Sequence, residues 1–180
     1  MRDDHLLVEA GLSWCWVLMD MWATSRSGSN AGRGFHYQDG VATEVAVRVW
    51  RGEFVARRIV PEGLEDVSVE TPSGWLHLQA KSRREHRGQF TLSDLAGAWR
   101  HLAERLAVDP TARAGLVLER PLPGVPFGLD RVLAESASAN VRAAVGLAVR
   151  DVLEPNDFLA RTCVVVMLNR PGFDGGSLVE

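Results

Sequence analysis

Cysteine is scarce in this chain of 180 residues, and its two copies, Cys15 and Cys163, lie far apart in the sequence. A disulfide framework is therefore not expected, and the composition favours a reducing cytoplasm. Neither cysteine belongs to a Cys-x-x-Cys pair or to a Cys/His cluster, so the sequence offers no zinc site of the usual kinds.

Positive charge is also in short supply, because 20 Lys and Arg residues stand against 23 Asp and Glu residues and give a formal net charge of −3. This balance excludes a nucleic-acid binder whose whole surface is basic, so any such binding needs a local basic patch. Hydrophobic residues make up 46% of the chain and charged residues 24%, which is typical of a globular domain and not of a disordered one.

A long uninterrupted apolar run is missing too. The tryptophan-rich start, residues 1–22, carries Asp3 and Asp4 where a signal peptide carries positive charge. Glu9 and Asp20 interrupt its apolar residues, which argues against a membrane span. We expect an amphipathic helix that packs on the domain or on a partner.

Glycine, serine and asparagine dominate residues 23–34, which favours a loop. No Gly-Lys-Ser/Thr follows, so this segment is not a Walker A loop. The sequence therefore predicts an N-terminal helix and linker over residues 1–31 and one domain over residues 32–180.

Within that domain, helical and strand patterns predict the order helix, three strands, helix, strand, helix, strand. The expected helices span residues 35–50, 91–107 and 129–153, the last of them in one or two pieces, and the expected strands span 53–60, 66–70, 75–81, 114–119 and 161–168. This order indicates an α/β or α+β domain built around a mixed sheet.

The second and third strands form a predicted hairpin around the turn Thr71–Gly74, which has Pro at its second position and Gly at its fourth. Pairing from this turn sets Asp66 opposite Gln79. One face is then apolar and expected in the core: Val67, Val69, Leu76, Leu78 and Ala80. The other face is polar: Asp66, Ser68, His77, Gln79 and Lys81.

An acid, an amide and an amine on one strand face suit a divalent cation and a phosphate. Oxygen ligands such as those of Asp66 and Gln79 bind Mg²⁺, which keeps waters for chemistry. The ammonium of Lys81 can position a water or offset charge on a phosphoryl oxygen. The alternative is a half-exposed sheet whose polar face simply meets water.

The stretch "GLEDVSVETPSGWLHLQAKS", preceded by the helix that contains "FHYQ", resembles the PD-(D/E)XK nuclease superfamily. More specifically, it resembles the nuclease domain of the CD-NTase-associated double-stranded DNA endonucleases of bacterial antiphage defence. The resemblance covers roughly residues 32–119. It implies a restriction-endonuclease-like αβββαβ core, in which helices flank a mixed sheet.

The resemblance also implies roles for the hairpin residues. Asp66 would bind the metal, Lys81 would align the attacking water, and Ala80 would contribute only its backbone carbonyl. Gln79 stands where the superfamily commonly has Asp or Glu, so one negative charge is missing from the metal site. Glu44 is the best candidate for a second metal-binding acid; the alternative is an exposed helical glutamate.

DNA contacts are expected from the basic segment that follows the hairpin, whose arginines are Arg83, Arg84 and Arg87. The alternative is a solvated loop whose charge is damped by Glu85 and Asp94. Gln38, from "FHYQ", would shape the site or touch DNA. Glu65 neighbours Asp66 but points to the opposite face of a regular strand, and we expect helical His101 to be structural.

Together these features predict a cytoplasmic, Mg²⁺- or Mn²⁺-dependent deoxyribonuclease that cuts double-stranded DNA, without a membrane anchor. We expect it to be the effector of an antiphage system, with a sensor or NTPase module attached or separately encoded, and to be a homo-oligomer when active. Two alternatives stay open. One is a catalytically inactive nuclease-like fold for nucleic-acid binding or assembly, and the other is an unrelated α/β interaction module.

Overall fold

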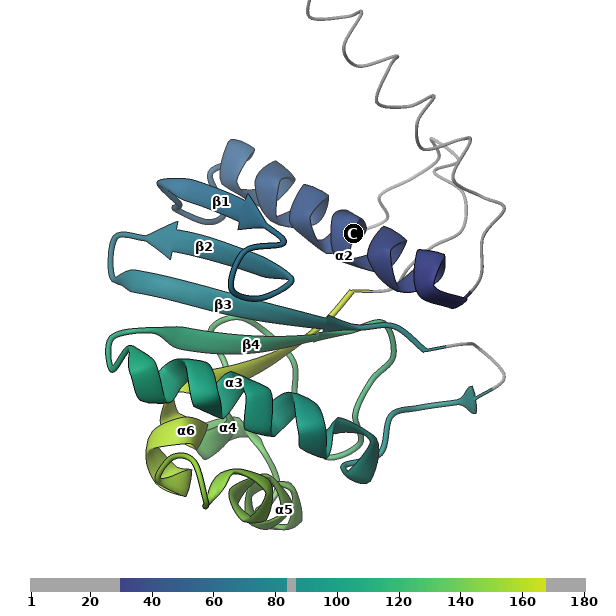
Figure 1. Ribbon diagram of the computed structural model, residues 1–180, viewed down its shortest axis with the longest axis vertical. Coiled ribbons are helices and arrows are strands. Elements are labelled where there is room, and N and C mark those ends of the chain that lie inside the picture. Colours follow the sequence, from purple (N-terminus) through teal and green to yellow (C-terminus); the bar gives the residue numbers. More distant parts are fainter. Residues whose placement is uncertain (1–29, 84–86, 168–180) are drawn as a thin grey trace, which may run out of the picture. The chain divides into compact units, whose positions relative to one another are not determined.

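A computed structural model of the chain describes residues 30–83 and 87–167 (Figure 1). The chain divides into two compact units, Met1–Phe35 and His36–Glu180, and the sheet belongs to the second. The helix expected over residues 1–22 lies outside the described residues, as does Arg84.

The second unit contains one five-stranded sheet with the strand order β1-β2-β3-β4-β5. Its strands are β1 (Arg58–Pro61), β2 (Val67–Thr71), β3 (Gly74–Lys81), β4 (Arg113–Leu118) and β5 (Thr162–Val166). The pairs β1–β2 and β2–β3 are antiparallel, whereas β3–β4 and β4–β5 are parallel. The fold is therefore α+β with an open mixed sheet, which confirms the coarse fold class predicted from the sequence.

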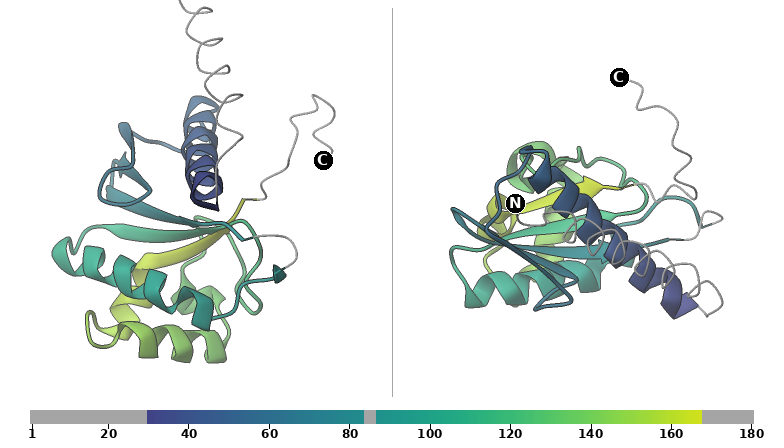
Figure 2. Two further views of the ribbon diagram at one scale, coloured as in Figure 1. Left: turned by 45° about the vertical axis from the view of Figure 1, so that its right-hand side comes forward. Right: turned by 90° about the horizontal axis from the view of Figure 1, so that it is seen from above.

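Helices flank both faces of this sheet (Figures 1 and 2). On one face lies α2 (Asn30–Trp50), which packs through Tyr37, Val41 and Val45. On the other face lie α3 (Ala96–Val108), the short α4 (Leu133–Ser136), α5 (Ala139–Val149) and α6 (Pro155–Arg161). None of the described helices is long and apolar enough to cross a membrane.

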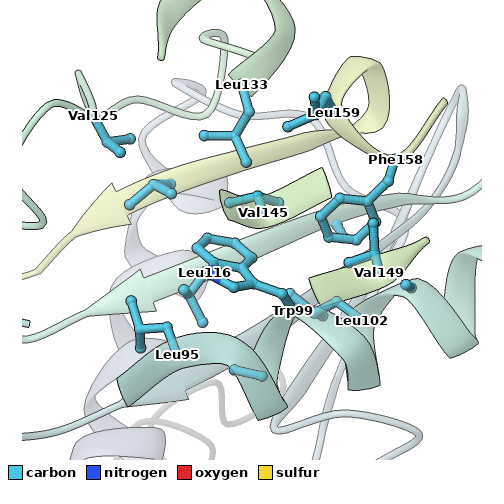
Figure 3. Close-up of a cluster of buried hydrophobic side chains, with 14 of the residues drawn as sticks. Leu95, Trp99, Leu102, Leu116, Val125, Leu133, Val145, Val149, Phe158 and Leu159 are labelled. Atoms are coloured by element: carbon cyan, nitrogen blue, oxygen red, sulfur yellow. The ribbon is translucent and has the colours of Figure 1, made fainter. Parts of the chain in front are cut away.

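The alternation of the strands creates two apolar cores. Val67, Val69, Leu76, Leu78 and Ala80 are buried against α2, as the sequence predicted. On the opposite face, Trp99 of α3 meets Phe158 of α6 edge to face, with ring centroids 6.3 Å apart (Figure 3). Aromatic pairs in this geometry stabilise a core beyond their buried area.

The register of the hairpin is the one predicted. Its pairs are Val67↔Leu78, Ser68↔His77, Val69↔Leu76, Glu70↔Trp75 and Thr71↔Gly74. Thr71 Oγ1 donates a hydrogen bond to the Gly74 carbonyl at 2.7 Å, and Gly74 has a φ of +122°, which residues with a Cβ rarely adopt. The turn therefore fixes which side chains of β2 and β3 share a face.

Two predicted boundaries are wrong. Helix α2 begins at Asn30, inside the expected loop, and β1 is only Arg58–Pro61, so residues 53–57 are not strand. The helix expected over residues 129–153 in one or two pieces is two helices, α4 and α5, which cover less of the chain than expected. The helix is interrupted at Ser138, because the backbone of Ser138 is extended. Its Oγ caps α5 by accepting a hydrogen bond from the Val141 N–H at 3.4 Å.

Helix α6 was missed by the sequence reading, although it carries a start signal. Pro155 occupies its first turn, where the missing N–H costs nothing. Glu154 caps the helix by accepting a hydrogen bond from the Asp157 N–H at 2.8 Å.

Two Gly-to-Ala substitutions test the packing. A Cβ at Gly115 in β4 would lie 2.6 Å from Leu78 Cδ2, so we expect Gly115→Ala to destabilise the fold by about 1–3 kcal/mol. A Cβ at Gly40 in α2 would meet nothing within 4 Å, so Gly40→Ala should stabilise it by up to about 1 kcal/mol. Urea unfolding measures both, and a neutral Gly115→Ala would contradict this packing of β4 against β3.

Candidate functional site

The candidate site lies where β3 and β4 end and β2 begins (Figure 1). Because β2 is antiparallel to β3, the residue just before β2 comes next to the last residues of β3. Asp66 is that residue, and Gln79, Ala80 and Lys81 are the last three residues of β3. The hairpin geometry alone therefore brings these four residues to one edge of the sheet.

Asp66 is held by two hydrogen bonds from two different elements. Its Oδ2 accepts from the Ala80 backbone N–H at 2.7 Å, and its Oδ1 accepts from Gln38 Nε2 of α2 at 2.7 Å. Each carboxylate oxygen can accept more than one bond, so both oxygens keep capacity for a further ligand. Gln38, expected to shape the site or touch DNA, contacts the proposed metal-binding acid directly.

Gln79 presents an unusual acceptor. Its side chain is 9% exposed, and its Oε1 is buried without a hydrogen-bond partner among the described residues. A buried polar atom left without a partner costs about 1–3 kcal/mol. An amide oxygen in this state can accept a bond from a water or ligate a hard cation, which is the role that the sequence assigned to it.

Lys81 is half-buried at the end of β3, where it pairs in register with Leu118. It alternates with Gln79, so both point to the sheet face that α3 covers. In the part of the chain that the structure describes, no hydrogen bond or ion pair joins its ammonium to Asp66 or to another side chain. Lys81 is also the only lysine of the sequence.

The polar face of the hairpin does not meet water, because α3 covers it. Ser68 and His77 are each 4% exposed, and Ser68 Oγ lies 3.1 Å from His77 Nδ1. Burial lowers the pKa of His77, with Asp109 opposing and Arg105 adding to the shift. His77 is therefore a neutral structural group at pH 7, and the alternative of a solvent-facing polar sheet is wrong for this hairpin.

Glu65 anchors the segment before β2 to α3. Its carboxylate is 1% exposed, and its Oε1 lies 2.8 Å from Arg105 Nε and 3.0 Å from His101 Nε2. Arg105 and His101 are four residues apart and so share one face of α3. Glu65 and Asp66 thus bond to opposite sides of the sheet, Glu65 on the α3 side with Gln79 and Lys81, and Asp66 on the α2 side. The prediction that Asp66 shares one face with Gln79 and Lys81 while Glu65 points to the other is therefore wrong, because residues 65 and 66 lie in a bend and not in a regular strand.

Glu44 takes another role. It pairs with Arg48 at 2.8 Å, and both side chains are more than 40% exposed. Glu44 follows Gln38 by six residues, which is about 9 Å along the helix axis. The structure therefore joins Gln38, not Glu44, to Asp66.

The described arginines that were expected to bind DNA, Arg83 and Arg87, differ in their contacts and exposure. Arg83 forms an ion pair with Asp94 and lies over the ring of Phe90, 5.3 Å from its centroid. The side chain of Arg87 is exposed, and its carbonyl accepts a bond from Arg83 Nε at 3.2 Å. Arg87 is thus open to a ligand, whereas the guanidinium of Arg83 is already engaged.

A divalent cation fits part of this arrangement. The Asp66 carboxylate and the unpartnered Gln79 oxygen are the donors that Mg²⁺ or Mn²⁺ accepts, and Mg²⁺ commonly uses one or two carboxylates and keeps its waters. Within residues 30–83 and 87–167, however, no group of three or more His, Cys, Asp or Glu side chains could hold a metal ion. Any cation here would depend on a single acid, an amide and water.

The sequence reading missed Glu119, which directly follows β4. It is 4% exposed, and it bonds to the Lys81 carbonyl and to the backbone N–H of Arg83. In the sequence pattern this glutamate marks only the end of an apolar strand. Its burial distinguishes Glu119 from an ordinary surface glutamate, and the spacing of residues in the sequence does not reveal burial.

Comparison with known proteins gives no relative. No family model, curated protein or solved structure matches the chain.

The anchor of Glu65 yields a stability prediction. Arg105→Ala should destabilise the fold by about 1–3 kcal/mol, because it removes one of the two partners of a buried carboxylate and leaves His101. Arg100→Ala is the matched control on α3, since Arg100 pairs with Glu104 at 3.7 Å with both side chains exposed. The control should change stability by less than about 1 kcal/mol. Equal effects in chemical denaturation would contradict a special role for the Glu65–Arg105 pair.

Proposed function

We propose that this chain is a metal-dependent endonuclease that hydrolyses phosphodiester bonds of double-stranded DNA. The observation that carries the proposal is the joint placement of Asp66 and Gln79. The carboxylate of Asp66 is tied to the Ala80 N–H beside Gln79, whose buried oxygen lacks a partner among the described residues.

The order of the elements supports the same proposal. The run α2, β1, β2, β3, α3, β4 is an αβββαβ unit, the element order that the resemblance to PD-(D/E)XK nucleases implies, and it carries Asp66, Gln79 and Lys81, to which that resemblance gives catalytic roles. We propose that the sheet is a restriction-endonuclease-like core. We further propose a cytoplasmic antiphage effector that works with a sensor or NTPase module and acts as a homo-oligomer.

In this proposal each residue has a definite task. Asp66 and Gln79 would hold Mg²⁺ or Mn²⁺, which when bound supplies charge neutralisation at the phosphate and a more acidic water. Gln38 orients the Asp66 carboxylate through its 2.7 Å hydrogen bond. Lys81 aligns the attacking water and stabilises negative charge that develops on the phosphoryl oxygens. Arg87 and Arg84 bind the DNA backbone near the site.

One observation favours a second candidate, an inactive nuclease-like module that binds DNA or assembles with partners. The proposed metal site has one acid, because Glu44 pairs with Arg48. DNA binding without metal-dependent cutting would support this second function. Nicking of plasmid DNA that requires Mg²⁺ or Mn²⁺ would exclude it.

The chemistry is tested with two substitutions in the site. Asp66→Asn keeps an oxygen for the Ala80 N–H but removes the charge, so it should raise the Mg²⁺ concentration needed for nicking. Lys81→Ala removes the ammonium and should slow nicking about 10²–10³-fold with less change in metal dependence.

Asp151→Asn is the control for this pair of variants, because Asp151 is 71% exposed at the end of α5 and its loss of charge should change nothing. Circular dichroism checks folding, and the assay is a Mg²⁺ titration of plasmid nicking. Well-folded Asp66→Asn and Lys81→Ala proteins that cut as fast as the parent would rule out this site.

The DNA contact is tested by the salt dependence of binding without a divalent metal. The double variant Arg84→Glu/Arg87→Glu should bind double-stranded DNA more weakly. Its log–log salt slope should fall by about 0.9 for each lost phosphate contact. Arg150→Glu reverses a charge that is 62% exposed on another part of the unit and serves as control. A slope equal to that of the parent would mean that the basic segment is only solvated.

A further inference from the structure

We infer that Glu119 is a positioning residue for Lys81, which it holds by bonding to the Lys81 carbonyl and to the backbone N–H of Arg83, two residues further along. The inference rests on the proposed function in that it assigns Lys81 a task at the phosphate. Its structural part, the restraint of Lys81, can be tested without DNA or metal.

Two hydrogen bonds form the restraint. The backbone N–H of Glu119 donates to the Lys81 carbonyl at 3.1 Å. The side-chain Oε2 of Glu119 accepts from the backbone N–H of Arg83 at 2.7 Å. A charge-assisted bond of this length is about twice as strong as a neutral one. One residue therefore fixes the chain immediately before and shortly after the point where β3 ends.

The surroundings of Glu119 keep this carboxylate in place. It is 4% exposed at the end of β4, the parallel neighbour of β3. Nearby Tyr37 donates its hydroxyl to the Met167 carbonyl at 3.0 Å. Burial and then the negative charge of Glu119 raise the pKa of Tyr37, so its phenol stays neutral. Glu119 is thus bonded to the exit of β3 and lies close enough to Tyr37 of α2 for its charge to act on that phenol.

Lys81 needs such a restraint for a physical reason. Its side chain is long, and ordering it costs up to about 2 kcal/mol. Within the described residues its ammonium makes no hydrogen bond or ion pair, so its location follows from the backbone that carries it. A displacement of about 1 Å in a catalytic group can cost 10²-fold in rate. Glu119 would prevent that displacement without touching the substrate.

The single lysine of the chain makes the restraint measurable. Labelling with ¹⁵N-lysine gives one backbone amide signal, that of Lys81, and ¹⁵N-tyrosine likewise reports Tyr37 alone. We expect an order parameter of about 0.85 for Lys81 in the parent and in Glu119→Gln, whose amide oxygen can still accept from Arg83. Glu119→Ala keeps the backbone bond to the Lys81 carbonyl but loses the bond to Arg83, so we expect the Lys81 order parameter to fall below that of the parent, while Tyr37 stays rigid.

Nicking supplies the second readout. Glu119→Ala should slow nicking about 10–100-fold without changing the Mg²⁺ concentration at half-maximal rate, because Asp66 and Gln79 are untouched. Glu119→Gln should restore most of the rate. Glu135→Ala, which alters an exposed glutamate of α4, is the control and should match the parent.

Three results would overturn the inference. One is a Lys81 amide as ordered in Glu119→Ala as in the parent. Another is a Lys81 amide that is as mobile in Glu119→Gln as in Glu119→Ala. That result would mean that the bond accepted from the Arg83 N–H does not restrain Lys81. The third is a loosened Lys81 with an unchanged nicking rate. If the parent itself cuts no DNA, the proposed function fails, and the order parameters still decide whether Glu119 restrains Lys81.

Discussion

The hydrogen bond from the Ala80 N–H to Asp66 Oδ2, 2.7 Å long, is the interaction on which the site depends. It joins the segment before β2 to the end of β3, beyond Val67↔Leu78, the hairpin pair furthest from the turn. Gln38 closes the arrangement from α2. Asp66 lies in the bend before β2, so without this contact its carboxylate would have no fixed relation to Gln79.

The two sides of the sheet contribute differently to that contact. The α2 side supplies an apolar core and the hydrogen bond from Gln38. The α3 side buries Ser68 and His77 and holds Glu65 through Arg105 and His101. The backbone at Asp66 is therefore anchored to α3 through the neighbouring Glu65, and the Asp66 carboxylate is bonded to Gln38 of α2. Such support from both sides is what a preorganised site requires.

Part of this structure follows from the sequence. The alternation of Val67, Val69, Leu76 and Leu78 around a Pro- and Gly-containing turn predicts the hairpin, its register and its buried face, because strand side chains alternate with a period of two. The bond between Gln38 and Asp66 joins residues 28 positions apart and depends on how α2 packs, which no local pattern encodes. The burial of Glu119 and the covering of His77 by α3 are likewise tertiary effects. Helix α6 is a different case, since Glu154 and Pro155 signalled it.

The account predicts one cation between Asp66 and Gln79, and anomalous scattering from a crystal grown with Mn²⁺ tests that most directly. The predicted result is an anomalous peak about 2.0–2.2 Å from an Asp66 carboxylate oxygen and from Gln79 Oε1, with waters completing the coordination. Asp66→Asn crystals grown in the same way should lack the peak. A fully ordered site with no peak at millimolar Mn²⁺, or with Gln79 Oε1 bonded to a protein donor, would contradict the account.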